Sequence, residues 1–291
     1  MVHKTGLITD STCDIPESLL ARYEILVVPA YIVWGEDFYR DRVELEPVEF
    51  YRRLEEDPVY PTTAHPTPED FVTAYERLRD QGVEELVVVT VSSAMSGTFD
   101  AAQQAGTQVD LPVHLVDARG PTLSSGWQTL AAARAREDGG DAEAMVAAAA
   151  AARRTMVQYV ALDTMEYLQK GGRIGRATQL IGSLLNIKPL VRIDHEAGVV
   201  ESAGRARTHS KAVDALYETF FAELQPQEGE RLHVAVLHGN VPDEAEALAE
   251  RVRREYAPEE LLINITGPVL GVHTGPRALA LCGYAETPHS Q

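Results

Sequence analysis

The chain has 291 residues, of which 45% are hydrophobic and 24% are charged, and its formal net charge is −18. This composition is typical of a globular protein long enough for two domains. So acidic a surface repels phosphate backbones, which argues against nucleic acid as a partner. The two cysteines have no metal or redox spacing, the start does not resemble a signal peptide, and no apolar run approaches the roughly 20 residues of a membrane helix. We therefore expect a cytoplasmic protein without a metal site or an integral membrane segment.

The first half of the chain alternates expected strands with expected helices. Short apolar runs predict strands at residues 4–9, 25–34, 38–43, 86–91 and 112–117. Helical patterns cover residues 47–56, 67–81 and 98–107, and two alanine-rich helices follow, separated near Asp138-Gly139-Gly140. This alternation predicts a mostly parallel sheet flanked by helices, in an N-terminal α/β domain over residues 1–158.

The pattern changes after about residue 158. Strands are expected at 157–162, 188–193, 199–207, 232–237 and 261–266, with a hairpin around "DHEAG". Two helices separated by a glycine turn are expected after residue 164, and further helices at 211–224 and 243–256. The segment "GPVLGVHTGPRALALCGY" is interpreted as a glycine loop followed by a terminal strand. We therefore expect a C-terminal α/β domain over residues 159–291, with a mixed or antiparallel sheet.

Four polar clusters are candidates for a ligand site. Three of them follow expected strands: "TDSTCD" (9–14), "SSAMSGT" (92–98) and "DARGPTLSSG" (117–126). The fourth, "PTTAHPTP" (61–68), is expected in a loop before a helix. Ligands of open parallel sheets bind at the carboxyl ends of strands, so these clusters could meet around one ligand. Each one alone is also typical of turns and helix caps.

Common catalytic motifs are not found in the sequence. It has no phosphate loop of the form GxxxxGK[ST], no GxGxxG after a strand, no G-x-S-x-G nucleophile elbow and no H-E-x-x-H. His238 and His273 each follow an apolar run, where a histidine is either structural or faces a pocket. The segment "LQKGGRIGRA" gathers Lys170, Arg173 and Arg176, either as caps of a helix end or as a cationic edge for an anion or a partner.

Seven motifs in sequence order resemble those of the DegV family of bacterial fatty-acid-binding proteins. They are "TDSTCDIP" (9–16), "TTAHPTP" (62–68), "SSAMSGTF" (92–99), "YLQKGGRIG" (167–175), "NIKPLV" (186–191), "RTHSKA" (207–212) and "GPVLGVHTGP" (267–276). The resemblance covers nearly the whole chain, and seven ordered motifs make it specific.

The resemblance implies a two-domain α/β protein that holds one long-chain fatty acid, such as palmitate or oleate, in a tunnel between its domains. It implies no cofactor and no catalytic residues. By motif, Thr63, Ser96 and His273 are expected to bind the fatty-acid carboxylate. The residues expected to support this pocket are Ser93, Gly97, Thr98 and His65.

Some members of the family deliver the bound acid to a fatty acid kinase, which forms an acyl phosphate. Arg173 and Arg207 are expected by resemblance to dock that kinase or to assist the transfer. The sequence departs from the family where Ala64-His65 replaces a Ser-Gln pair and where Arg277 replaces a glycine. These departures concern the shape of the pocket and its preference for chain length.

Two enzyme functions remain as alternatives. A subunit related to dihydroxyacetone kinase and the phosphocarrier domains could carry a phosphoryl group on His273 or His238. A serine hydrolase could use Ser96 with His273, although the sequence does not identify the third group that would orient the histidine.

Overall fold

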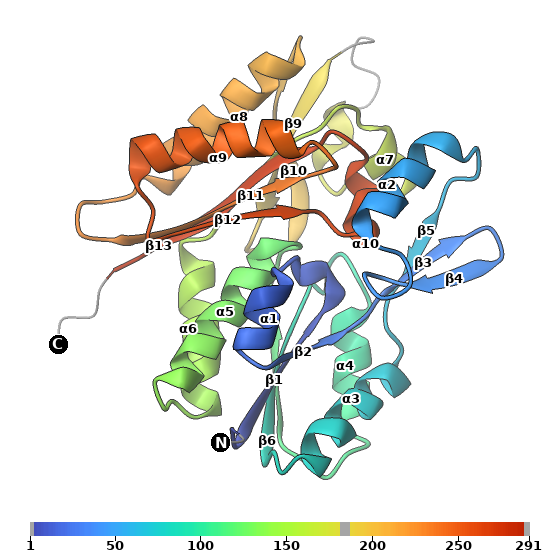
Figure 1. Cartoon of the computed structure of the whole chain (residues 1–291), viewed down its shortest axis with the longest axis vertical. Coiled ribbons are helices and arrows are strands. Elements are labelled where there is room, and N and C mark those ends of the chain that lie inside the picture. The colour runs from blue at the N-terminus through green and yellow to red at the C-terminus, as the bar shows by residue number, and fades with distance from the viewer. Residues whose placement is uncertain (1–2, 181–186, 288–291) are drawn as a thin grey trace.

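The chain folds into three β-sheets surrounded by helices (Figure 1), and the computed structural model describes residues 3–180 and 187–287. A four-stranded sheet and a six-stranded sheet form the two main layers, and a three-stranded sheet lies beside them. Within the described residues, the helices are too short or too polar for any of them to cross a bilayer.

The four-stranded sheet is parallel throughout, with the order β2-β1-β6-β7. Its strands are β1 (Thr5–Asp10), β2 (Ile25–Val28), β6 (Glu85–Thr90) and β7 (Val113–Asp117). One face is covered by α3 (Pro68–Asp80) and α4 (Thr98–Gly106), and the other by α1 (Glu17–Arg22), α5 (Leu123–Glu137) and α6 (Ala142–Arg154). Successive strand residues point to opposite faces, so Ile8 packs with α3 and α4, whereas Leu7 packs with α5 and α6. The predicted parallel sheet with covered faces is confirmed.

The six-stranded sheet is mixed, with the order β10-β9-β8-β13-β11-β12. Its strands are β8 (Val157–Ala161), β9 (Lys188–Asp194), β10 (Val199–Ala206), β11 (Arg231–His238), β12 (Glu260–Ile265) and β13 (Leu279–Glu286). Within this sheet, β11 and β12 are parallel neighbours and the other described pairs are antiparallel; the antiparallel pair β9–β10 confirms the predicted hairpin.

The two faces of the six-stranded sheet have different neighbours. Helices α8 (His209–Leu224) and α9 (Pro242–Tyr256) cover the outer face. The inner face packs toward the parallel sheet, and the buried Trp127 of α5 donates from Nε1 to the carbonyl of Cys282 at 3.3 Å. Helix α5 therefore lies between the two main sheets.

The three-stranded sheet has the order β4-β3-β5, and its strands are β3 (Tyr31–Trp34), β4 (Asp37–Arg40) and β5 (Thr62–Ala64). Helices α2 (Pro47–Glu56) and α10 (Pro268–Thr274) pack on it around Trp34 and Phe50. This packing brings α10, which is close to the end of the chain, beside strands from its first quarter (Figure 1).

Two strand predictions were wrong. The strand expected over residues 25–34 is divided between β2 and β3, which belong to different sheets. Pro29 lies at the break and has no N–H for a continuous ladder. The "PTTAHPTP" segment, expected as a loop, contains β5, in which Thr63 is the register partner of Ile32 on β3.

The prediction of a glycine loop before the last strand was also wrong, because this segment forms helix α10. Pro268 stands at its first position and Gly275, with φ +72°, follows its end, which are the usual boundary residues of a helix. Glycine within a helix lowers its propensity, but packing requires the glycine at position 271. A methyl group on Gly271 would lie 2.4 Å from the ring of Phe50.

The glycine turn around "KGGRIG" follows α7 (Glu166–Lys170), as predicted. A 3₁₀ turn at Ala177–Leu180 comes next, and the remainder of the second helix expected here falls on residues 181–186, outside the described residues.

Polar contacts join the halves of the chain, among them those of Arg42 and Ser92. The guanidinium of Arg42 donates to Asp14 at 2.6 Å and to the carbonyl of Ile265 at 2.7 Å. Ser92 donates from Oγ to the carbonyl of Gly198, in the turn between β9 and β10, at 2.8 Å. The domain boundary expected at residue 158 falls within β8, and a division at this point stays a prediction.

Candidate functional site

A cavity lies between the carboxyl ends of the parallel strands and the inner face of the six-stranded sheet. Its empty volume is about 1010 Å³, which includes the space at its open mouth. The segments after β1, β6 and β7 contribute to its wall, together with β5, α10 and strands of the six-stranded sheet. The predicted meeting of the polar clusters around one site is thus found in the structure.

Most of the cavity wall is aliphatic. Val160 of β8, Val191 of β9 and Ala280 of β13 are neighbours in the sheet register, and all three line the cavity. Leu168 of α7 and Leu270 of α10 add to this apolar surface. A wall of this kind favours a hydrocarbon chain over a polar ligand.

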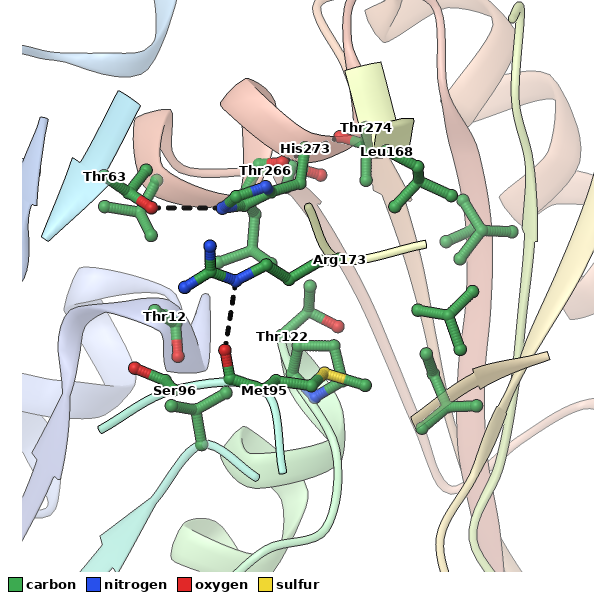
Figure 2. Close-up of a pocket in the computed structure, with 18 of the residues that line it drawn as sticks. Thr12, Thr63, Met95, Ser96, Thr122, Leu168, Arg173, Thr266, His273 and Thr274 are labelled. Atoms are coloured by element: carbon green, nitrogen blue, oxygen red, sulfur yellow. Dashed lines mark hydrogen bonds between the residues drawn. The ribbon is translucent and has the colours of Figure 1, made fainter. Parts of the chain in front are cut away.

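The hydroxyls of Thr12, Thr63 and Ser96 lie on one side of the cavity together with the imidazole of His273, whereas Leu168 lies on the other (Figure 2). Thr63 Oγ1 lies 3.1 Å from His273 Nε2, and both residues line the cavity. Ser96 lines the same cavity, and its Oγ lies 2.8 Å from Thr98 Oγ1. The three residues expected at the carboxylate, Thr63, Ser96 and His273, therefore share one cavity.

His273 is held neutral by its position in α10. Burial, and to a smaller extent the positive charge of Arg173, lower the pKa of His273 to about 4. The imidazole packs directly on the backbone of Gly171, where a methyl group would lie 2.1 Å from His273 Nδ1. A neutral imidazole donates one hydrogen bond and accepts another, so Nε2 can donate to an anion.

Arg173 reaches this same side of the cavity from the glycine turn after α7. Its Nε donates to the carbonyl of Met95 at 3.1 Å (Figure 2), and its Nη1 donates to the carbonyl of Gly171 at 3.0 Å. The residue is exposed and yet lines the cavity, which is the position of a residue at a mouth. Arg207, in contrast, is exposed directly after β10 and is not part of the cavity wall.

The residues expected to support the pocket separate into two groups. Thr98 and His65 line the cavity, and Gly97 packs so closely on His65 that a methyl group there would lie 2.7 Å from its Nε2. Ser93 is exposed and donates from both its N–H and its Oγ to Asp117, so the structure does not bring it to the cavity. The first hydroxyl of "SSAMSGT", Ser92, is likewise directed to the hairpin turn rather than to the cavity.

The arrangement does not support a phosphocarrier role for His238 or a serine hydrolase that uses Ser96 with His273. His238 accepts a hydrogen bond at Nδ1 from the N–H of Val241 and is absent from the cavity wall, so it has a structural role. Ser96 contacts Thr98 and His273 contacts Thr63, so the expected nucleophile and base are not hydrogen-bonded to each other. No group of three potential metal-ligating side chains was found in the described parts of the chain.

Sequence reasoning did not single out several polar residues of the cavity wall, namely Thr12, Thr122, Gln158, Thr266 and Thr274. Thr12 and Thr122 belong to polar clusters that the sequence analysis named as candidate ligand sites, without choosing any single residue in them. Gln158 had a clearer signal, because it is a polar residue at the start of an otherwise apolar strand.

A model of the DegV family, described as "Uncharacterised protein, DegV family", matches residues 4–286. A DegV domain-containing protein of Streptomyces coelicolor is 35% identical and covers 97% of this chain and 98% of its own length. A fatty acid-binding protein of Thermotoga maritima is 32% identical, covering 94% of this chain and 95% of its own. The solved structure of a DegV family protein from Thermus thermophilus, described by its fatty acid binding, has a TM-score of 0.89 and 33% identity and covers 97% of this chain and 99% of its own. The chain belongs to the DegV family.

Proposed function

We propose that this protein binds one long-chain fatty acid, such as palmitate or oleate, in the cavity between its two main sheets. The carboxylate lies at Thr63, Ser96 and His273, and the acyl chain extends along the aliphatic wall. The observation that carries the proposal is the division of one cavity into an end with the Thr63 and Ser96 hydroxyls and the His273 imidazole, and a remainder that is mainly aliphatic. The fatty acid binding of the relatives from Thermotoga maritima and Thermus thermophilus supports it.

The energetics of such a ligand match this division. A fatty acid has only its carboxylate oxygens as polar atoms, and hydrogen bonds from neutral donors to a charged group contribute roughly 1.5–3 kcal/mol each. The acyl chain supplies most of the affinity. At about 0.8 kcal/mol per buried CH₂ group, a sixteen-carbon chain gains on the order of 10 kcal/mol before the costs of binding are subtracted.

We further propose that the protein acts as a carrier, which presents the bound acid to a fatty acid kinase. Arg173 supports this proposal because it joins the hydroxyl and imidazole end of the cavity to the protein surface. A neutral donor set leaves a carboxylate oxygen available to attack a phosphoryl group, whereas a bidentate arginine would engage both oxygens. The role of Arg207 rests on the family motif alone.

The ligand is tested on protein purified from its own cells. Denaturing extraction followed by lipid mass spectrometry is expected to release a long-chain fatty acid in near-equimolar amount. Delipidated protein should regain thermal stability when palmitate or oleate is added below micelle formation, because a ligand that binds only the folded state stabilises it. An empty extract together with no thermal shift for any long-chain acid would contradict the proposed function.

A further inference from the structure

A second group of polar side chains lies in the aliphatic part of the cavity. Gln158 lines the cavity on the same face of β8 as Val160, and Leu162 continues this row after the strand ends. At about 3.3 Å per residue, Gln158 lies about 13 Å along the wall from Leu162. In the register, Ala161 pairs with Leu279 near the end of α10, whereas Gln158 pairs with Cys282 further away. Gln158 is therefore remote from the His273 end of the cavity.

Thr122 contacts Gln158 and is strained. Its Oγ1 accepts a hydrogen bond from Gln158 Nε2 at 2.9 Å, and both side chains line the cavity. Figure 2 shows Thr122 between the side of the cavity with Thr63 and Ser96 and the side with Leu168. The backbone of Thr122 has φ 56° and ψ −140°, a conformation that glycine adopts easily and a β-branched residue rarely does. Strain of this kind persists where the surrounding structure enforces it, and strained residues cluster at ligand and active sites.

A chain of hydrogen bonds behind Gln158 determines which group remains to contact a ligand. Ser124 Oγ donates to Gln158 Oε1 and lies 2.8 Å from His195 Nε2. Ser124 has only one hydrogen, so His195 must be the donor of the second bond, and burial, which lowers the pKa of His195 to about 4, keeps it neutral. Donation then runs from His195 through Ser124 and Gln158 to Thr122.

The hydroxyl group of Thr122 stands at the end of this series of hydrogen bonds, so its own hydrogen remains to be donated. Among residues 3–180 and 187–287, no acceptor receives it. Ser124 is fully buried behind the wall, whereas Thr122 and Gln158 face the cavity. A methylene group against Thr122 would leave this buried donor unpaired, which is costly, whereas an oxygen on the acyl chain would satisfy it.

We propose that Thr122 and Gln158 form a selectivity site for a hydroxyl group on the distal half of the acyl chain, the half that ends in the methyl group. The preferred ligand is then a hydroxylated long-chain fatty acid rather than a plain one. This inference rests on the proposed function, because it places the carboxylate at Thr63, Ser96 and His273. A site built to hydrogen-bond a ligand oxygen discriminates against the analogue that lacks it.

The test compares the binding of stearate with that of stearates hydroxylated at carbon ten, twelve or fourteen, by calorimetry on delipidated protein. At least one hydroxylated acid is expected to bind about 3- to 10-fold more tightly than stearate. Thr122→Val keeps the size and branching of the side chain but removes the hydroxyl, so it should abolish this preference without weakening stearate. Thr122→Ser retains the hydroxyl and should retain the preference. Gln158→Met is a second variant that should abolish it.

The outcomes separate the two proposals. If the wild type binds stearate but binds every hydroxylated acid no more tightly than stearate, the selectivity site is overturned and the proposed function stands. A preference that survives in both Thr122→Val and Gln158→Met would also overturn it. Failure of stearate and all hydroxylated acids to bind would instead contradict the proposed function itself.

Discussion

Thr63 and His273 are 210 positions apart in the chain, yet Thr63 Oγ1 lies 3.1 Å from His273 Nε2. Thr63 belongs to β5 and His273 to α10, and the two meet because α10 packs on the three-stranded sheet. The hydroxyl and imidazole end of the cavity therefore exists only when both halves of the chain are folded together.

Removing one donor from this end should weaken fatty-acid binding. Thr63→Val and Ser96→Ala are each expected to reduce affinity for palmitate by about 5- to 150-fold, the effect of losing one hydrogen bond to a charged group. Calorimetry on delipidated protein measures the change. Ser93→Ala is the matched control, because Ser93 lies in the same loop but contacts Asp117 outside the cavity. If Ser96→Ala bound palmitate as tightly as the wild type, the carboxylate would have to lie elsewhere.

Arg173 should affect transfer more than binding. In Arg173→Ala, affinity for the fatty acid should change little, whereas acyl-phosphate formation with a matched kinase and ATP should fall at least tenfold, the scale of one lost charge-assisted contact. The two measurements are made on the same preparation. Arg176→Ala is the control, since Arg176 is an exposed neighbour paired with Asp194 and Glu201 and absent from the cavity wall.

The results for Arg173 distinguish three roles. A proportionate loss of binding and transfer would make Arg173 a ligand of the carboxylate. No change in either measurement would leave it a residue that only connects the glycine turn to Met95. Reduced transfer with retained binding is the expected result.

His273 should make the delipidated protein less stable in mild acid. Burial lowers its pKa from 6.5 to about 4, so between these values the unfolded chain binds a proton that the folded chain does not. The free energy of unfolding should therefore decrease as the pH falls through this range, by on the order of 3 kcal/mol from this group. His273→Gln does not titrate and should lose this component.

The comparison must be made between wild type and variant rather than on the wild type alone. Burial lowers the pKa of His195 in the same way, and it raises the pKa of Asp41 to about 7, which stabilises the folded state as the pH falls. Urea unfolding of both proteins across the pH range isolates the His273 component. Parallel curves for the two proteins would show that His273 is charged, or accessible to protons, in the folded state.

Gly171→Ala should disturb the site through steric contact alone. The backbone of Gly171 has φ −74°, which any residue adopts, but the added methyl group would lie 2.1 Å from His273 Nδ1. We expect a loss of about 1–3 kcal/mol in stability, or a similar loss in fatty-acid affinity if the imidazole moves instead. Gly106→Ala is the control, because its methyl group would lie at an ordinary 3.6 Å from Val113. If Gly171→Ala changed neither the melting temperature nor the affinity for palmitate, the close packing of Gly171 on His273 would be contradicted.

The main sheets were predictable because their signals are local. Val-rich runs and capped helices such as α3, where Thr67 forms a capping box with Asp70, identify themselves within a few residues. Helix α10 was missed because its glycine at position 271 lowers helix propensity, and only the contact with Phe50 explains that residue. Such a contact between distant segments has no local signature.

The site was predictable only in part, for the same reason. Family motifs identified Thr63, Ser96 and His273, and the structure brings them to one cavity, although their contact with a ligand stays a prediction. Ser93 could not be separated from its neighbours by sequence, since all the residues of "SSAMSGT" suit a loop after a strand. The direction of its hydroxyl depends on Asp117 of β7, a partner fixed by the sheet register.

The position of β13 has a consequence for how the protein is made. This strand is the last element of the described chain, but it lies inside the six-stranded sheet, between β8 and β11. During synthesis the earlier strands of this sheet leave the ribosome without the strand that joins them, whereas the parallel sheet is already complete in sequence. The cavity wall that contains Ala280 therefore closes only after β13 has been synthesised. A nascent chain stalled before residue 279 should have no complete cavity for a ligand, so loading should follow the synthesis of β13.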